Sequence, residues 1–412
     1  MSPSPPAGLL TLQLRPGHPD LLDLPWHLPL SAWEGACPRW VEIPRGLSRH
    51  EVLFVSYGEV VYALKELPGS VAEREYAALR ELEARALPAV TPVGLAHTRP
   101  EGTGEERGVL VTQYLQGSLP YRTLFMQPGL ERYRARLVDA LAVLLVRLHL
   151  GGCFWGDCSL SNSLFRRDAG ELQAYLVDAE TSELHPTLSD GQRRFDLDLM
   201  EENVAGGLVD LIAAGAASAA ALDWRETSAS VRRRYEQLWA EITREELVGA
   251  GDSFLVQERI RKLNALGFSV GEVELVATGD GAHLRMRTIV TDRNHHRHLL
   301  HNLTGLVAEE HQAQLLLNDV REWKVAATRE LNRSLPLSVA AHRWLNERFL
   351  SVTQSMQGAG APEDLCELFC QVLEHKWLMS EREKEDVGFK RAVADYRALR
   401  GLAEPVEPAP SE

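Results

Sequence analysis

Residues 151–165 read GGCFWGDCSLSNSLF, and they hold one acid and one amide among residues that cannot pair with either. The acid is Asp157 and the amide is Asn162, in the pattern Asp-x-x-x-x-Asn. Small residues beside Asp157 permit a tight loop and leave room for a substrate, whereas bulky apolar residues on both sides can anchor the loop to a core. The stretch therefore predicts an anchored loop that presents two polar side chains.

Composition narrows the class of protein. The chain has 412 residues, 45% hydrophobic and 25% charged, an ordinary balance for a soluble protein of two or three domains. The net charge of −14 disfavours a broad nucleic-acid surface, because phosphate backbones attract basic surfaces. No run of about 18 apolar residues occurs, and the start MSPSPPAG lacks the features of a signal peptide. With five sparse cysteines, we expect a cytoplasmic protein without structural disulfides.

Upstream of the loop, residues 43–116 predict a small α/β lobe, preceded by an N-terminal extension over 1–42. Two β-like runs, 51–58 and 59–67, are joined by a turn at Tyr57-Gly58. Residues 70–85 have the apolar spacing of a helix with Ser70 as its N-cap, and 108–115 predict a further strand.

Downstream, residues 117–222 predict a helical second lobe. The segment 134–149 is apolar almost all round, which indicates a buried helix. A short strand over 171–178 ends on Asp178, and a further helix covers about 196–214. Residues 223–402 predict a mostly helical domain interrupted by one β-hairpin that turns at 279–281, and the Pro-rich tail 403–412 is predicted to be disordered.

Five residues occur in an order that resembles the protein-kinase-like fold, over residues 43–215. They are a strand lysine, a helix glutamate, the two loop residues and the acid that ends the next strand: Lys65, Glu75, Asp157, Asn162 and Asp178. The resemblance implies a two-lobed α+β fold that binds ATP and Mg²⁺. In it the lysine contacts nucleotide phosphates and pairs with the glutamate, Asp157 is the base, and Asn162 and Asp178 hold the metal.

The same resemblance assigns the rest of the site. Glu180 could add a second carboxylate toward the metal, and the backbone at Gln113 and Leu115 falls where the family binds adenine. The usual glycine-rich loop is absent. The phosphate cover would then be residues 45–50, RGLSRH, with Ser48 and Arg49 as donors.

Departures from the protein-kinase pattern indicate an atypical member. Trp155 and Gly156 replace the usual His and Arg, and Ser159 stands where a phosphate-contacting side chain is common. Asp178 and Asp196 are too close in sequence for a long activation segment. These features favour a small-molecule or lipopolysaccharide-kinase-like enzyme, and the whole chain resembles a bacterial kinase-like family with a C-terminal domain of unknown function. Asp196 and Asp198 are both interpreted as carboxylates favoured by a helix N-terminus, with bracing of the catalytic loop by one of them as the alternative.

The acceptor is left open by the sequence, and two other functions compete with a kinase. The first is a pseudokinase-like nucleotide switch whose C-terminal domain binds a partner. The second is a nucleic-acid-associated module that uses the basic segment 285–301, which the overall acidity disfavours. Within that segment we predict a basic patch that binds the phosphoryl acceptor or an acidic partner: Arg285, Arg287, Arg293, His295, His296, Arg297 and His298.

Overall fold

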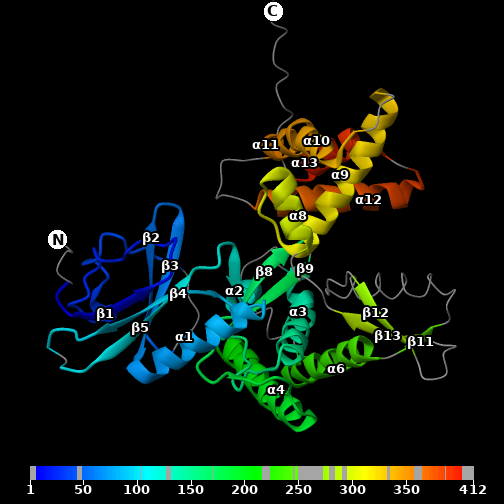
Figure 1. Cartoon of the computed structure of the whole chain (residues 1–412). Helices are drawn as coiled ribbons and strands as arrows, with labels where there is room; N and C mark the ends of the chain where they lie inside the picture. The colour runs from blue at the N-terminus through cyan, green and yellow to red at the C-terminus, as the bar shows by residue number, and fades with distance from the viewer. Residues whose placement is uncertain are drawn as a thin grey trace, which may run out of the picture. The chain divides into compact units, whose positions relative to one another are not determined.

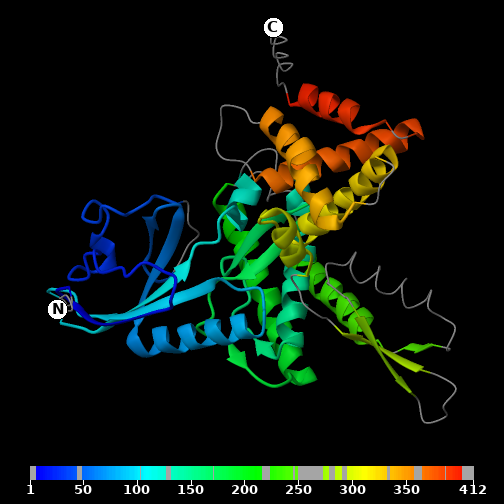
Figure 2. The same cartoon turned by 45° about the horizontal axis from the view of Figure 1, so that its top comes forward.

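The computed structural model forms two compact units (Figures 1 and 2). One unit comprises Met1–Arg166 and Leu172–Ile242, and the other comprises Arg167–Glu171 and Thr243–Glu412. The structure describes residues 6–43, 49–102, 104–126, 131–169, 171–215, 223–244, 246–248, 272–277, 284–289, 295–331, 335–356, 364–385 and 387–400.

The N-terminal lobe is built on a five-stranded antiparallel sheet of order β1-β4-β5-β3-β2. Its strands are β1 (Leu9–Leu14), β2 (Val52–Tyr57), β3 (Val60–Pro68), β4 (Thr91–Thr98) and β5 (Arg107–Gln113). Gly58 makes the predicted turn between β2 and β3 with a φ of 62°, a conformation that glycine adopts without strain. Helix α1 (Gly69–Ala84) packs on β4 and β5. A Cβ at Gly108 would lie 2.5 Å from the Cβ of Ala72, so glycine permits this close packing.

Two details of this lobe differ from the sequence interpretation. Pro68 occupies the N-cap position of helix α1 and makes no side-chain hydrogen bond there. The predicted N-cap, Ser70, lies inside the helix. The expected extension 1–42 contributes the edge strand β1, which pairs with β4, and the short helix η1 (Leu30–Ala32). Trp26 and Trp33 of this segment are fully buried in the core of the lobe. Their burial removes large apolar surfaces from water, and this holds the segment on the lobe.

The second lobe is mainly helical. Its elements are β6 (Ser118–Pro120), α2 (Tyr121–Met126), α3 (Glu131–Leu150), β7 (Cys153–Phe154), β8 (Ser163–Asp168), β9 (Glu171–Leu176), β10 (Glu183–Leu184), α4 (Asp190–Ala213) and α6 (Trp224–Thr243). Helix α3 is buried as predicted along residues 137–149. Helix α4 begins before the predicted residue 196, because Ser189 and Gln192 form a capping box. Helix α6 belongs to this first unit, which continues past the expected boundary at residue 222.

The second unit is mostly helical, as predicted, and contains the expected hairpin. Its elements are β11 (Glu246–Val248), β12 (Glu272–Ala277), β13 (Leu284–Ile289), α8 (His295–Thr304), α9 (Glu310–Leu331), α10 (Leu337–Trp344), η2 (Leu345–Leu350), α11 (Ser351–Met356), α12 (Leu365–Glu383) and α13 (Phe389–Leu399). Strands β12 and β13 pair antiparallel. The predicted turn at 279–281 and the tail 403–412 lie outside the described residues.

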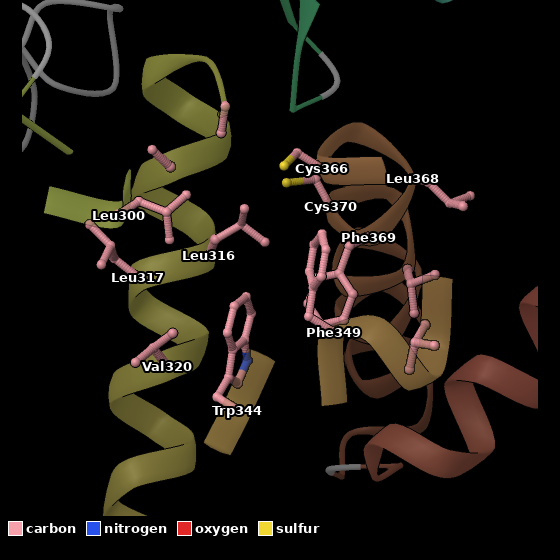
Figure 3. Close-up of a cluster of buried hydrophobic side chains, with 14 of the residues drawn as sticks. Leu300, Leu316, Leu317, Val320, Trp344, Phe349, Cys366, Leu368, Phe369 and Cys370 are labelled. Atoms are coloured by element: carbon pink, nitrogen blue, oxygen red, sulfur yellow. The ribbon is translucent and has the colours of Figure 1, made fainter. Parts of the chain in front are cut away.

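Aromatic side chains organise the core of this second unit. Trp344, Phe349 and Phe369 are fully buried and lie 5.1–5.6 Å apart between ring centroids, with Leu300 and Leu316 in the same cluster (Figure 3). Contacts at this separation add to the stabilisation from burial. The five cysteines are all free and buried.

The tip of the turn after β8 also belongs to the second unit. Asp168 accepts hydrogen bonds from the backbone N–H groups of His311 and Gln312 in the first turn of α9, at 3.2 and 2.8 Å. Ala169 donates its N–H to Glu367 at 2.7 Å. A carboxylate at these N–H groups satisfies donors that the helix itself leaves unpaired.

Candidate active site

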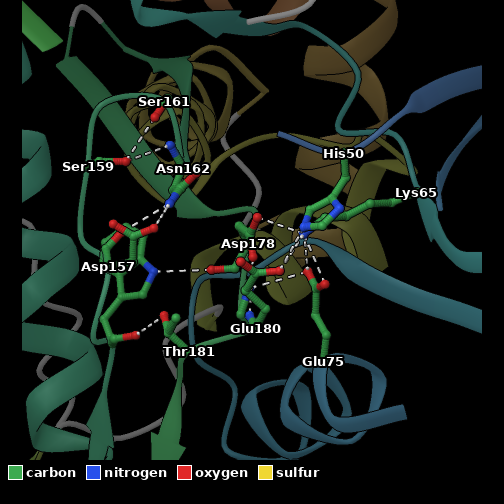
Figure 4. Close-up of polar contacts among 12 residues, drawn as sticks. His50, Lys65, Glu75, Asp157, Ser159, Ser161, Asn162, Asp178, Glu180 and Thr181 are labelled. Carbon is green, nitrogen blue, oxygen red and sulfur yellow. Dashed lines mark hydrogen bonds and ion pairs between the residues drawn. The ribbon is translucent and has the colours of Figure 1, made fainter. Parts of the chain in front are cut away.

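Lys65 and Glu75 form a buried ion pair between β3 and α1. The Lys65 ammonium lies 3.2 and 3.0 Å from the two carboxylate oxygens of Glu75, whose side chain is fully buried (Figure 4). Burial opposes the charge on Lys65, but the attraction of Glu75 and Asp178 raises its pKa. Since an unpaired charge at this depth would be costly, the two residues are held as a pair.

Asp178 follows β9 and brings a second acid to the same ammonium. Its Oδ2 lies 2.6 Å from Lys65 Nζ, and Glu180 Oε2 lies 3.9 Å from the same nitrogen and 3.3 Å from His50 Nε2. One oxygen each from Glu75, Asp178 and Glu180 lie within 4.8 Å of one another. Burial, with repulsion from Asp178, raises the pKa of Glu75 to about 7.

This donor set fits a magnesium ion. Three carboxylates converge on a single ammonium, so the site has more acidic groups than the lysine alone can neutralise. Hard divalent cations prefer oxygen ligands of this kind. Asp178 and Glu180 are the more accessible pair, with side-chain exposures of 22% and 20%, whereas Glu75 is enclosed.

The loop before Asp157 is fixed by a buried indole and a glycine. Trp155 is fully buried and donates its Nε1–H to the backbone oxygen of Asp178 at 3.2 Å, which ties the loop to the segment that follows β9. Gly156 has a φ of 78°, and a Cβ there would lie 2.9 Å from the backbone oxygen of Thr181. These two residues, which depart from the protein-kinase pattern, therefore give the loop its shape.

Asn162 turns back onto Asp157. Its Nδ2 donates to the backbone oxygen of Asp157 at 3.1 Å and to its Oδ2 at 3.0 Å. Both amide hydrogens are used in this way, so the amide oxygen is available for a cation. Ser159 supports the turn, because its hydroxyl accepts the N–H of Asn162 at 3.2 Å. The serine that replaces a phosphate-contacting residue thus has a structural contact within the loop.

Asp196 braces the loop. Its preferred interpretation from the sequence, as a carboxylate favoured by a helix N-terminus, was therefore wrong, and the alternative of a loop brace is correct. Its two oxygens accept the backbone N–H groups of Trp155 at 2.7 Å and Gly156 at 2.9 Å, and His149 Nε2 lies 3.0 Å away. The residue is fully buried in the second turn of α4, beyond the first turn that begins at Asp190. Only the tertiary contact of α4 with the loop distinguishes the two interpretations.

These side chains line one cavity of about 540 Å³ in the first unit. Lys65, Asp157, Asn162, Asp178 and Glu180 lie on its wall, and so do other predicted nucleotide-binding residues: Arg49, Gln113 and Leu115. Ser48 lies outside the described residues. Glu75 is not part of the cavity wall, and it contacts the site through Lys65.

Sequence reasoning missed Asn203, another residue of this wall. Its Nδ2 donates to Asp157 Oδ1 at 2.9 Å from α4. Burial raises the pKa of Asp157, while the charge of Arg49 and the two asparagine hydrogen bonds oppose the increase. No local pattern marks Asn203, since it lies far along the chain from the loop.

The basic patch is only partly within the described structure. Arg293 lies outside the described residues, and Arg285 and Arg287 are described by backbone alone on β13. His296 Nδ1 lies 2.6 Å from Glu310, and Arg297 lies 3.7 Å from Glu309. These acids reduce the net positive charge at the start of α8, so an anion would meet a weaker attraction there than the sequence suggests.

Two segments of the chain match models of known protein families. Residues 60–241 match the family model of the lipopolysaccharide kinase (Kdo/WaaP) family, and residues 237–399 match a domain of unknown function, DUF4032. No curated protein matches the chain. A structure of WaaP in complex with acyl carrier protein is 19% identical, with 62% of this chain and 99% of that chain covered and a TM-score of 0.36. An aminoglycoside-3'-phosphotransferase of type VIII is 17% identical, with 57% and 97% covered and a TM-score of 0.35.

The family match therefore supports the predicted protein-kinase-like class for residues 60–241, and residues 237–399 match DUF4032. Within that superfamily, its kinase-like region is similar to the lipopolysaccharide kinases. A phosphotransferase of kinase-like fold is the function that this family supports. Among the helices that the structure describes, none has the length and apolar character needed to cross a membrane.

Proposed function

We propose that the protein is an ATP- and Mg²⁺-dependent phosphotransferase that acts on a hydroxyl group, in the cytoplasm. The observation that carries the proposal is the convergence of two pairs on one cavity: Lys65 with Asp178, and Asp157 with Asn162. Phosphoryl transfer needs positioned phosphates and charge neutralisation more than covalent help from the protein. This cavity offers one cation and several oxygen donors for those tasks.

Each residue then has a role. Lys65, held by Glu75, contacts nucleotide phosphates, and Arg49 and Ser48 cover them. The backbone at Gln113 and Leu115 receives the adenine. As the acceptor oxygen bonds to the terminal phosphorus and the bond to the bridging oxygen breaks, the hydroxyl proton passes to Asp157 and ADP leaves.

Asn162, Asp178 and Glu180 would hold magnesium. When bound, the ion supplies positive charge that neutralises the phosphate oxygens. Without it, the protein already restrains these ligands: Asp178 through Lys65, and Asn162 through Asp157.

Nucleotide binding and turnover test the proposal separately. Mg-ATP should raise the melting temperature of the wild type, because a ligand bound only by the folded state stabilises it. Asp178→Ala should remove most of that rise. Asp157→Asn should retain it while ADP formation falls by about 10²–10⁴-fold. Absence of a rise at millimolar ATP in the wild type would count against every nucleotide-dependent function.

A nucleotide-binding switch is the second candidate. It is favoured by the loop from Asp157 to Asn162, in which Ser159 replaces a phosphate-contacting side chain and bonds within the loop. In this case Mg-ATP would stabilise the wild type, but neither the wild type nor Asp157→Asn would form ADP. The C-terminal domain would then bind an acidic partner through the patch in 285–301, and reversal of Arg297 to Glu should weaken that interaction.

A further inference from the structure

Asn203 is the one side chain of α4 that is hydrogen-bonded to Asp157 in the described structure. Its Nδ2 lies 2.9 Å from Oδ1, while Nδ2 of Asn162 lies 3.0 Å from Oδ2. Each carboxylate oxygen thus accepts one amide hydrogen, and each keeps a second lone pair. Two donors on opposite oxygens restrict rotation of the carboxylate, and a lone pair remains to receive a proton.

The contact joins two elements that are far apart in sequence. Asp157 lies in the loop after β7, and Asn203 lies near the middle of α4. Asp196, on the same helix, binds the backbone of Trp155 and Gly156 just before Asp157. Helix α4 therefore holds the backbone of the loop at one point and the reactive side chain at another.

The stability of α4 has other sources. Its buried face includes the apolar residues Leu197, Met200, Val204 and Leu208, and its N-terminus has a capping box. Asn203 is only partly buried and lines the cavity. Replacement of its side chain should thus leave the helix packed, so that its effect on Asp157 can be measured.

We propose that Asn203 is a positioning residue of the phosphoryl-transfer site, where it and Asn162 hold the carboxylate of Asp157 oriented toward the acceptor. The role rests on the proposed function, since it needs Asp157 to receive a proton. Asn203 itself neither gives nor takes one. The hydroxyl proton moves to a carboxylate oxygen of Asp157, and the two amides remain hydrogen-bonded throughout.

This role has a signature in the kinetics. Two amide hydrogen bonds hold the carboxylate of Asp157 in one orientation, and loss of the Asn203 amide leaves only the one from Asn162. A misplaced base slows the chemical step without weakening the binding of the nucleotide. Loss of the Asn203 amide should consequently lower kcat and leave the affinity for ATP unchanged.

The experiment uses the full chain with Mg-ATP and water as the acceptor, so that ADP and phosphate are the products. The turnover number kcat and the affinity for ATP are measured for wild type, Asn203→Ala, Asn203→Asp and a control on the same helix, Val209→Ala. Val209 is 42% exposed and is not among the cavity residues. We expect Asn203→Ala to lose about tenfold in kcat, with unchanged ATP affinity.

Asn203→Asp keeps the size of the side chain but places a second carboxylate against Asp157. It should lower kcat further than Asn203→Ala, because the new carboxylate repels Asp157 and cannot donate the hydrogen bond that holds it. Since this substitution is nearly isosteric, it tests the role even where the alanine variant folds poorly. Val209→Ala should keep the wild-type kcat.

The outcomes separate this inference from the proposed function. A wild type that Mg-ATP does not stabilise, or that binds ATP without turnover, overturns the enzymatic proposal and with it the role of Asn203. A wild type that turns over, with kcat unchanged in both Asn203 variants, overturns the positioning role alone. A loss of ATP affinity as large as the loss of kcat would mean that Asn203 only supports the structure.

Discussion

Lys65→Met should destabilise the first unit, because it leaves the buried carboxylate of Glu75 without its cationic partner. The Glu75 side chain is fully buried and Lys65 is only 13% exposed, with 3.0 Å between their charged atoms. Removal of one partner of a buried ion pair typically costs about 3–5 kcal/mol. We take about 3 kcal/mol, since Glu75 has a pKa of about 7 and can relieve part of the cost by protonation.

For a unit of this size the loss corresponds to a decrease of roughly 6–12 °C in melting temperature. The assay is thermal and urea unfolding without nucleotide, followed by circular dichroism. The cost should grow with pH. In the variant, Glu75 has a folded-state pKa above its unfolded value, so its contribution to stability is greatest at low pH and is lost as pH rises through the folded-state value.

Two controls isolate the charge effect. Arg107→Met removes an ion pair with Glu105 whose side chains are 38% and 67% exposed, and it should cost less than about 1 kcal/mol. The double variant Lys65→Met/Glu75→Gln removes both buried charges and should recover more than half of the loss. If Lys65→Met melts within a degree of the wild type at pH 8, the argument from the buried charge is refuted.

Two further predictions follow from buried acids. Asp196→Asn should lower turnover and melting temperature together, because an amide can accept from only one of the two N–H groups of Trp155 and Gly156; wild-type behaviour in ADP formation and in melting would contradict this. Burial and the nearby Glu309 raise the pKa of Asp168 to about 8, although two backbone N–H groups oppose the increase. Its contribution to the stability of the second unit should be full below about pH 4 and lost as pH rises through 8. Melting from pH 4 to 9 should therefore show a fall in stability that is flatter in Asp168→Asn, and equal slopes would disprove the assignment.

Local patterns in the sequence were sufficient for the main elements of the kinase-like region. The alternation around Lys65, the helical spacing around Glu75 and the strand before Asp178 are short-range signals, and the structure has a strand, a helix and a strand at these places. The order of these residues, with Asp157 and Asn162, suggested one site. The structure brings them together around one cavity and its adjoining ion pair.

The sequence by itself determined the main helices and strands of the site and the residue types that they carry, because periodicity and capping act between neighbours in the chain. Tertiary structure alone decided three other features. It packed Trp26 of the supposed extension into the lobe, used Asp196 to brace a loop, and brought Asn203 to Asp157. A polar side chain such as Asn203 has the same local pattern whether it meets solvent or a carboxylate. Its role is fixed only when the packing of α4 brings two distant segments within hydrogen-bonding distance.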